Sequence, residues 1–134
     1  MVHHVSSTSD DPRHPVQTVL ELNRPSYWVT TGMYPQVIVL KMKSAVYVSS
    51  IQVRQSFVKK MKVQCIQSKS VVNTEAQIAH CTDPKNSYKA QSFAYHTHDF
   101  QFEGEPADFV QIEIQEAQEE FSIIHSVCVY GESE

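Results

Sequence analysis

The sequence predicts an all-β fold, an antiparallel jelly-roll β-sandwich of about eight short strands with one short helix. Three observations predict this class. Apolar and polar residues alternate with a period of two in several segments, as in half-buried strands. Turn signals separate those segments, and only residues 16–22 favour a helix. The 134 residues fit one domain, residues 1–134, and are enough to bury a core.

In the first half of the chain, we expect the short helix to be followed by a strand that contains Trp28 and ends in a turn. Residues 37–40 are apolar on both faces, which is typical of a central strand. Within residues 46–54 the apolar positions change face. We therefore expect a β-bulge near Ser49 and Ser50, because one extra residue shifts the register. Residues 42–45 give a weaker turn signal.

In the second half, residues 61–65 and 110–114 alternate cleanly between apolar and polar side chains, so each predicts a half-buried strand. Residues 115–120 contain good helix formers, but the stretch is short and we expect a loop between the last two strands. Four shorter signals complete the set: strands at 93–95 and 127–129, and turns at 83–86 and 104–106.

Composition restricts the class of protein. Hydrophobic residues make up 41% and charged residues 19%, as in soluble globular proteins. No apolar run is long enough to span a bilayer, and the N-terminus lacks the pattern of a secretory signal. The three cysteines are odd in number and have no C-x-x-C spacing, which favours free thiols in a reduced intracellular compartment. The net charge of -4 argues against nucleic-acid binding.

The charged residues are distributed unevenly along the chain. Every Lys and Arg lies at or before Lys89, whereas ten of the 15 acidic residues lie at or after Asp99. One interpretation is that basic and acidic strands pair within one sheet, and it is the favoured one. The other is a charged patch that faces a protein partner and includes Lys59 and Lys60.

Candidate catalytic groups are few. His96-Thr97-His98-Asp99 resembles part of a zinc site, but no third ligand is indicated, and a polar strand end or hairpin loop is favoured. Cys65 and Cys128 lie in strand patterns and are expected to be buried, whereas Cys81 is expected to be the exposed thiol. The sequence has no nucleophile elbow, phosphate-binding glycine loop or H-E-x-x-H helix. We therefore expect no enzymatic activity, with a thiol- or zinc-dependent enzyme as the weakest hypothesis.

The segment YWVTTGMYPQ at residues 27–36 is unusually apolar for a turn. We expect Trp28 to lie in the core and Met33 and Tyr34 to lie at the exposed bend. The alternative is that the bend fills the mouth of the sandwich, since exposed apolar patches are uncommon on monomers.

Three segments, in this order, resemble one family. They are SDDPRHP at residues 9–15, the YWVTTGMYPQ segment, and FSIIHSVCVYG at residues 121–131. The chain resembles the discoidin-type, galactose-binding-like jelly-roll subunit of intraflagellar transport complex B. In that family an S-D-x-x-H-P-like entry, a W-x-T-T-G-[ML]-[FY]-P-Q block and a closing H-S-V-x-x-x-G strand recur, and the resemblance covers nearly the whole chain.

The resemblance implies a non-enzymatic adaptor. Such subunits form a heterodimer with a small Rab-like GTPase, join the other complex B subunits, and support ciliary cargo transport and export of signalling proteins. It implies a location in the cilium or flagellum and in the cytoplasm near the basal body. The expected contact surface comprises Thr31, Met33, Tyr34 and Gln36, with Lys59 and Lys60 as a second possibility. A lectin-like or lipid-binding jelly roll is the alternative function.

The resemblance also raises the question of calcium. Related domains hold calcium in a D-G-N-x-x-T-x-W segment, which here is ELNRPSYW at residues 21–28. The candidate ligands are Glu21, Asn23 and Ser26. Calcium needs several oxygen atoms around one point, and the longer Glu21 side chain and the charge of Arg24 make that harder. Loss of calcium is therefore favoured over retention.

Overall fold

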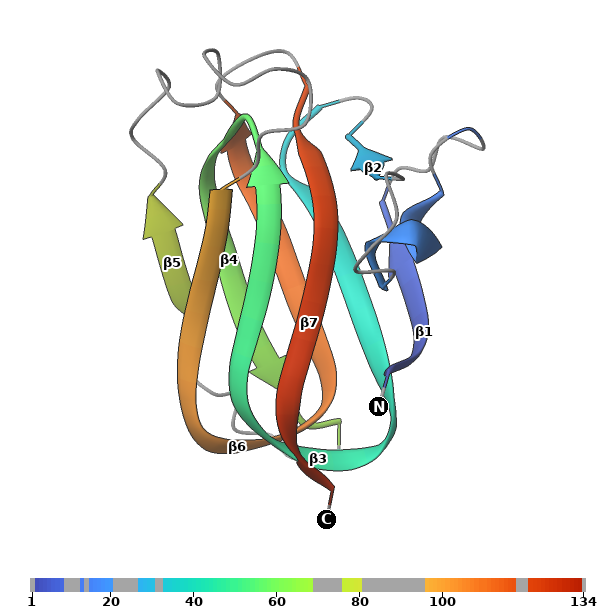
Figure 1. Cartoon of the computed structure of the whole chain (residues 1–134), viewed down its shortest axis with the longest axis vertical. Helices are drawn as coiled ribbons and strands as arrows, with labels where there is room; N and C mark the ends of the chain where they lie inside the picture. Colours follow the sequence, from blue (N-terminus) through green and yellow to red (C-terminus); the bar gives the residue numbers. More distant parts are fainter. Residues whose placement is uncertain are drawn as a thin grey trace.

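The computed structural model describes residues 2–8, 13, 15–20, 27–30, 33–68, 76–80, 96–117 and 121–133. In these ranges the chain forms seven strands and one 3₁₀ helix, shown in Figure 1. Their bounds, in order, are β1 (Val2–Ser7), η1 (Val16–Leu20), β2 (Trp28–Val29), β3 (Gln36–Ser56), β4 (Val58–Ile66), β5 (Gln77–His80), β6 (His96–Ala117) and β7 (Ile123–Ser133).

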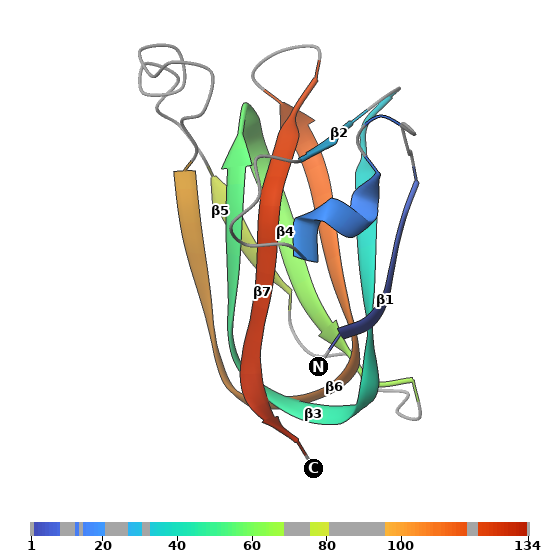
Figure 2. The same cartoon turned by 45° about the vertical axis from the view of Figure 1, so that its right-hand side comes forward.

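The strands form two packed layers because β3 and β6 are long enough to run through both. In the five-stranded layer the order is β1, the first half of β3, the second half of β6, β4 and β5. In the four-stranded layer the order is β2, β7, the second half of β3 and the first half of β6. All pairings are antiparallel. Figure 2 shows both long strands curving from one layer into the other at the same end of the molecule.

The two long strands bend where their pairing is interrupted. The register between β3 and β6 shifts between Lys41 and Val46, and β6 contains Gly104 with φ of +69°, a conformation that favours glycine. The turns predicted at residues 42–45 and 104–106 are therefore wrong. Both segments lie at corners inside continuous strands, because the chain pairs with the same partner strand before and after the bend.

A β-bulge near Ser49 and Ser50 is confirmed. The register of β3 shifts between Val48 and Ser50 in its pairing with β6 and again in its pairing with β7. An extra residue at this point reverses which face each following side chain occupies. The bulge thus explains why Ile51 and Val53, rather than Ser50 and Gln52, lie in the core.

Most of the other element predictions are confirmed, with two corrections. The expected helix is a 3₁₀ helix over the described residues Val16–Leu20, and its Val16 and Val19 are buried. The region of residues 115–120 was expected to be a loop, but β6 continues to Ala117 because Lys60 and Val58 of β4 still pair with it. His96–Asp99 begins β6, so of the two favoured alternatives the polar strand end is confirmed. The predicted strand at 93–95 and turn at 83–86 lie outside the described residues.

The core lies between the two layers and is built from alternate residues of each strand. The side chain of Trp28 is 0% exposed, which confirms its predicted place. The inward residues of β3, β4 and β6 are also buried: Ile38, Leu40, Met61, Val63, Val110, Ile112 and Ile114. The 3₁₀ helix η1 packs against β1, β2 and β7 and so closes one side of the sandwich. No helix in the described ranges is long and apolar enough to span a bilayer.

Candidate functional site

The turn before β3 presents one large apolar side chain to solvent. Met33 is 87% exposed, as predicted for the bend. Met has a flexible, polarizable side chain that adapts to the shape of a partner. Thr31, the first residue of the expected contact surface, lies outside the described residues, and its role stays a prediction.

Tyr34 lies beside Met33, but its ring is half-buried and packs against the core. Its hydroxyl lies 2.9 Å from Thr30 Oγ1 and donates to Ser122 Oγ at 3.3 Å. Thr30 and Ser122 are buried and also bond through their backbones, with Thr30 N–H donating to the Ser122 carbonyl at 3.0 Å. The prediction that Tyr34 lies wholly at the exposed bend is therefore wrong, because its hydroxyl joins the turn to the start of β7.

Gln36 holds the turn from its other side. Its side chain is only 5% exposed, its amide nitrogen donates to the Met33 carbonyl, and its Oε1 accepts a hydrogen bond of 2.6 Å from Thr8 Oγ1. A buried amide with two such partners is not available to another protein. The inclusion of the Gln36 side chain in the contact surface is thus corrected: it positions Met33 instead.

Lys59 and Lys60 both lie on the outer side of β4. The register between β4 and β6 shifts on both sides of Lys60, so these two lysines lie between the buried Val58 and Met61. A bulge of this kind allows consecutive side chains to face solvent. Lys59 is exposed and Lys60 is half-exposed, so both are accessible to a partner.

The two predicted contact regions lie at the same end of the five-stranded layer. Gln36 of β3 pairs with Ile114 of β6, and Ile114 pairs with Met61 of β4. These three residues form one row across the sheet, in which β3 and β4 are about 10 Å apart. The Met33 turn lies just before one end of this row, and Lys60 lies next to the other.

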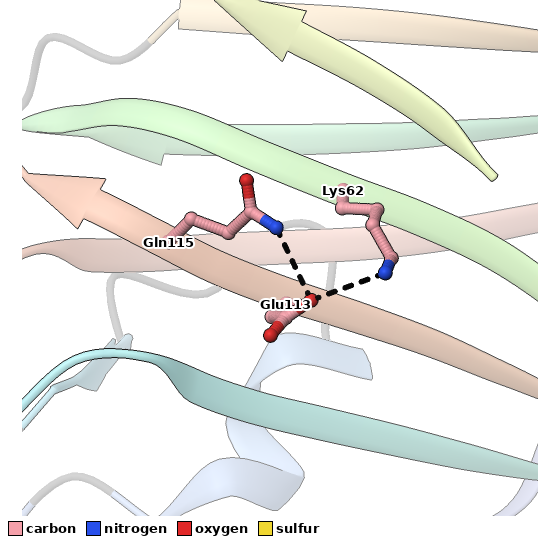
Figure 3. A network of polar contacts seen from close by, with 3 residues as sticks. All are labelled: Lys62, Glu113 and Gln115. Atoms are coloured by element: carbon pink, nitrogen blue, oxygen red, sulfur yellow. Dashed lines mark hydrogen bonds and ion pairs between the residues drawn. The ribbon is translucent and has the colours of Figure 1, made fainter.

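Basic and acidic strands do pair within this layer. Lys62 Nζ lies 3.6 Å from Glu113 Oε2, across the β4–β6 pair, and the Gln115 amide nitrogen donates to the same oxygen at 3.4 Å. Figure 3 shows the three side chains together. The favoured interpretation of the uneven charge distribution is confirmed at this position. Such a half-exposed pair stabilises the fold by only a few tenths of a kcal/mol.

An aromatic pair that the sequence does not predict lies at the same end of the molecule. The rings of Phe57 and Phe121 meet edge to face, with centroids 5.4 Å apart, and Phe121 is 41% exposed. Phe57 follows β3 with φ of 70°, a conformation that is rare for an aromatic residue. Neither residue lies in an alternating pattern, so no local signal pointed to the pair.

The structure tests only some of the metal ligands and thiols that the sequence suggests. Among the described residues no group of three or more His, Cys, Asp or Glu side chains could hold a metal ion. The calcium candidates Glu21, Asn23 and Ser26 lie outside the described residues, so that site stays a prediction.

Cys65 is buried as predicted, and burial, with a smaller effect of the Glu105 carboxylate, raises its pKa to about 12. The prediction for Cys128 is wrong, since it is half-exposed. Cys81 is not among the described residues.

The orientation of the Gln55 side chain determines which nitrogen of His98 carries the proton. The Val58 N–H donates to Gln55 Oε1 at 2.9 Å, which leaves the amide nitrogen 3.1 Å from His98 Nε2. An amide nitrogen only donates, so His98 Nε2 must accept the hydrogen bond. The ring is therefore neutral and carries its proton on Nδ1. Burial lowers the pKa of His98, the nearby His96 lowers it further, and Asp99 opposes them. Burial also lowers the pKa of His125.

We expect these two histidines to make the fold less stable in mild acid. An unfolded His has a pKa of about 6.5. Because the folded pKa values are lower, the unfolded state binds more protons below that pH. The free energy of unfolding is therefore highest above about pH 6.5, where both histidines are neutral in either state. It falls as the pH drops through the folded pKa values of the two histidines. Urea denaturation between about pH 7.5 and 5.5 should show this fall, and His98→Gln should make it shallower. His4→Gln, at an exposed position of β1, is the control. Equal slopes in His98→Gln and wild type would contradict the assignment.

Comparisons with known proteins agree with this fold and add a sequence relationship. The chain is 25% identical to the human intraflagellar transport protein 25 homolog over 128 residues, which covers 95% of this chain and 84% of the human protein. It is 38% identical to intraflagellar transport protein 25 of Chlamydomonas reinhardtii over 66 residues, covering 48% of this chain and 35% of the algal protein. No protein-family model matches the chain.

Solved structures of carbohydrate-binding modules have the same fold. A family 32 module of Clostridium perfringens in complex with galactose superposes with a TM-score of 0.73 at 18% identity, covering 94% of this chain and 91% of the module. A fucose-binding module of Streptococcus pneumoniae gives 0.73 at 12% identity, covering 95% and 92%. At such identities the likeness shows the fold alone. These matches confirm the predicted jelly-roll sandwich, and the sequence matches confirm the resemblance to the intraflagellar transport subunit.

Proposed function

We propose that this chain is a non-enzymatic adaptor subunit of intraflagellar transport complex B, which pairs with a small Rab-like GTPase in the cilium or flagellum. In that role it supports cargo transport and the export of signalling proteins. The observation that carries this proposal is the sequence similarity to intraflagellar transport protein 25, which extends over 95% of the chain. The same similarity supports a location in cilia and in the cytoplasm around the basal body, and contacts with other complex B subunits.

The Met33 turn is the part of the proposed contact surface with the most favourable geometry. Its side chain is 87% exposed, while the Gln36 amide donates to the Met33 carbonyl and the neighbouring Tyr34 is bonded to Ser122. Because the Met33 backbone is already hydrogen-bonded, it loses less conformational entropy when a partner binds, so more of the contact energy contributes to affinity. Phe121 adds a second exposed apolar side chain next to the Ser122 anchor.

A Met33→Glu variant tests this surface. The charge would have to be buried against the partner, so we expect about a tenfold loss of affinity for the purified Rab-like GTPase of the same organism, with stability unchanged. Gel filtration and calorimetry at micromolar concentration give the two readouts. The control is Tyr130→Ser, which changes another exposed residue, on β7. Unchanged affinity of Met33→Glu would remove the turn from the interface.

A lectin-like or lipid-binding module is the second candidate function. The galactose and fucose modules that share this fold favour it, but function depends on the site rather than on the fold. Aromatic side chains that stack on sugars must be accessible, and Tyr34 has its hydroxyl engaged internally. Tyr47 is an exposed alternative. Clear signals on a glycan array or in liposome flotation, without any binding to the GTPase, would replace the adaptor function with this one.

A further inference from the structure

A single residue carries the chain from one layer of the sandwich to the other. β3 ends at Ser56 in the four-stranded layer, and β4 begins at Val58 in the five-stranded layer. These two strand ends lie opposite the C-terminus (Figure 1). Phe57, between them, has φ of 70°, which is unfavourable for a bulky residue and persists only where surrounding contacts hold it. We call Ser56, Phe57 and Val58 the crossover.

The side chain of Gln55 holds the crossover in this shape. The Val58 N–H donates to Gln55 Oε1 at 2.9 Å, so the bond spans the crossover from one strand to the next. The Gln55 amide nitrogen lies 3.1 Å from His98 Nε2 on β6 and donates to it. Gln55 and Val58 are both 0% exposed, so water does not compete for these bonds. We call this pair of hydrogen bonds the Gln55 bridge.

The Gln55 bridge requires a neutral His98. A proton taken from water onto Nε2 would turn this acceptor into a donor, directed at the NH2 group of Gln55, which also donates. Reversing the amide would present Oε1 to the imidazolium, but it would direct the NH2 group at the Val58 N–H, another donor. In the observed positions of the two partners, neither orientation of the amide satisfies both once His98 is protonated.

The bond to the charged ring is the stronger of the two, because a hydrogen bond with an ionised partner exceeds a neutral one. We therefore expect the amide to turn toward the imidazolium and to leave the Val58 N–H. A buried backbone N–H without an acceptor is unfavourable, so the crossover moves until water reaches it. Phe57 then loses the contact that maintains its conformation, and its ring separates from Phe121, whose centroid is 5.4 Å away.

The surroundings of His98 set the pH at which this happens. Burial lowers the pKa of His98 most, His96 on the same strand lowers it further, and Asp99 raises it. The ring is therefore neutral at neutral pH and takes up its proton only below its ordinary value of about 6.5. The neighbouring strands carry further charged or titratable groups at this end of the sandwich: Arg54 on β3, Lys59, Lys60 and Lys62 on β4, Glu116 on β6 and His125 on β7.

We propose that the Gln55 bridge is a pH-sensitive switch, in which protonation of His98 in mild acid opens the crossover and separates Phe57 from Phe121. The switch is a property of this chain alone and does not depend on the proposed function. Phe121 is 41% exposed and adjoins Ser122, which bonds the Tyr34 hydroxyl at 3.3 Å. Opening of the crossover therefore changes the apolar surface next to the Met33 turn.

Nuclear magnetic resonance of the isotope-labelled full chain tests the switch between about pH 7.5 and 4.5. We expect the Val58 amide resonance to shift with the same midpoint as the His98 imidazole. The protection of the Val58 amide against hydrogen exchange, corrected for the intrinsic effect of pH, should fall at least about tenfold over this range. The protection of Ile112 in the core should fall less, because core amides exchange only when the sandwich unfolds.

Two substitutions remove the conflict in different ways. His98→Gln takes up no proton and can still accept from Gln55, so Val58 should stay protected across the range. Gln55→Glu places a carboxylate that accepts from both the Val58 N–H and the protonated His98. Val58 should then also stay protected, while His98 titrates at a higher pH than in the wild type. The matched control is His96→Gln on the same strand, which should leave the response of Val58 to pH in place.

Three results would overturn the switch. The first is a His98 imidazole that titrates while the Val58 amide does not change. The second is a Val58 amide that follows the midpoint of another histidine. The third is an equal loss of protection at Val58 and Ile112, which would mean that acid unfolds the whole sandwich. If Gln55→Glu does not fold, the comparison of the wild type with His98→Gln still decides the question.

Discussion

Replacing Trp28 with alanine is expected to lower the free energy of unfolding by about 3–5 kcal/mol, the range for truncation of a buried aromatic side chain. Trp28 is 0% exposed and belongs to the two-residue strand β2, which pairs with Ile123 and Ile124 of β7. A strand this short has few hydrogen bonds, so the indole ring is its main attachment to the core. Chemical denaturation of the purified chain measures the effect.

The control for Trp28→Ala is Met33→Ala in the same segment. Met33 is almost fully exposed, so its truncation should change stability by no more than about 0.5 kcal/mol. If Trp28→Ala lowered the free energy of unfolding by less than about 1 kcal/mol, the indole ring would not be a main contributor to the stability of the sandwich.

Replacing Gly131 with alanine is expected to cost about 1–3 kcal/mol, as overpacking does elsewhere. A Cβ atom at Gly131 would clash with the backbone carbonyl oxygen of Tyr47. Gly131 pairs with Val48 in the β3–β7 ladder, and a backbone atom cannot rotate away as a side chain would. The added methyl group must therefore push β7 away from β3.

Gly104 provides the contrast, because its requirement for glycine has a different cause. A Cβ atom there would meet nothing within 4 Å, but φ is +69°, which costs about 1–2 kcal/mol for most residues and less for asparagine. We therefore expect Gly104→Asn to be better tolerated than Gly104→Ala, whereas Gly131→Asn should be at least as harmful as Gly131→Ala. Urea denaturation of the four variants separates the two causes. Similar losses for Gly131→Ala and a neutral surface variant would contradict the close approach.

The sequence was sufficient to predict features that follow from local alternation. Residues 61–65 and 110–114 alternate over consecutive positions, and each forms a strand with the expected inward side chains. The bulge at Ser49 and Ser50 could be predicted for the same reason, because an extra residue changes the phase of the pattern. The corners in β3 and β6 could not be predicted from the sequence. A turn signal marks a change of direction, but only the pairing on both sides decides whether the chain reverses or bends.

Several features of the candidate site depend on contacts between residues that are distant in sequence. Tyr34 was expected at an exposed bend because nothing near it indicated that Thr30 and Ser122 would bind its hydroxyl. The burial of Gln36 depends in the same way on Thr8. From the sequence alone, Lys59 and Lys60 are a contact region separate from the turn at Met33. Only the register between β3, β6 and β4 places them at the same end of the sheet as Met33.

The proposed pairing of this chain with a small Rab-like GTPase is tested most directly by sedimentation velocity of an equimolar mixture. The chain has a mass of 15.3 kDa. With the purified Rab-like GTPase of the same organism at micromolar concentration, we expect a single boundary at the mass of a one-to-one complex. Two boundaries, each at the position of the isolated protein, would contradict the account.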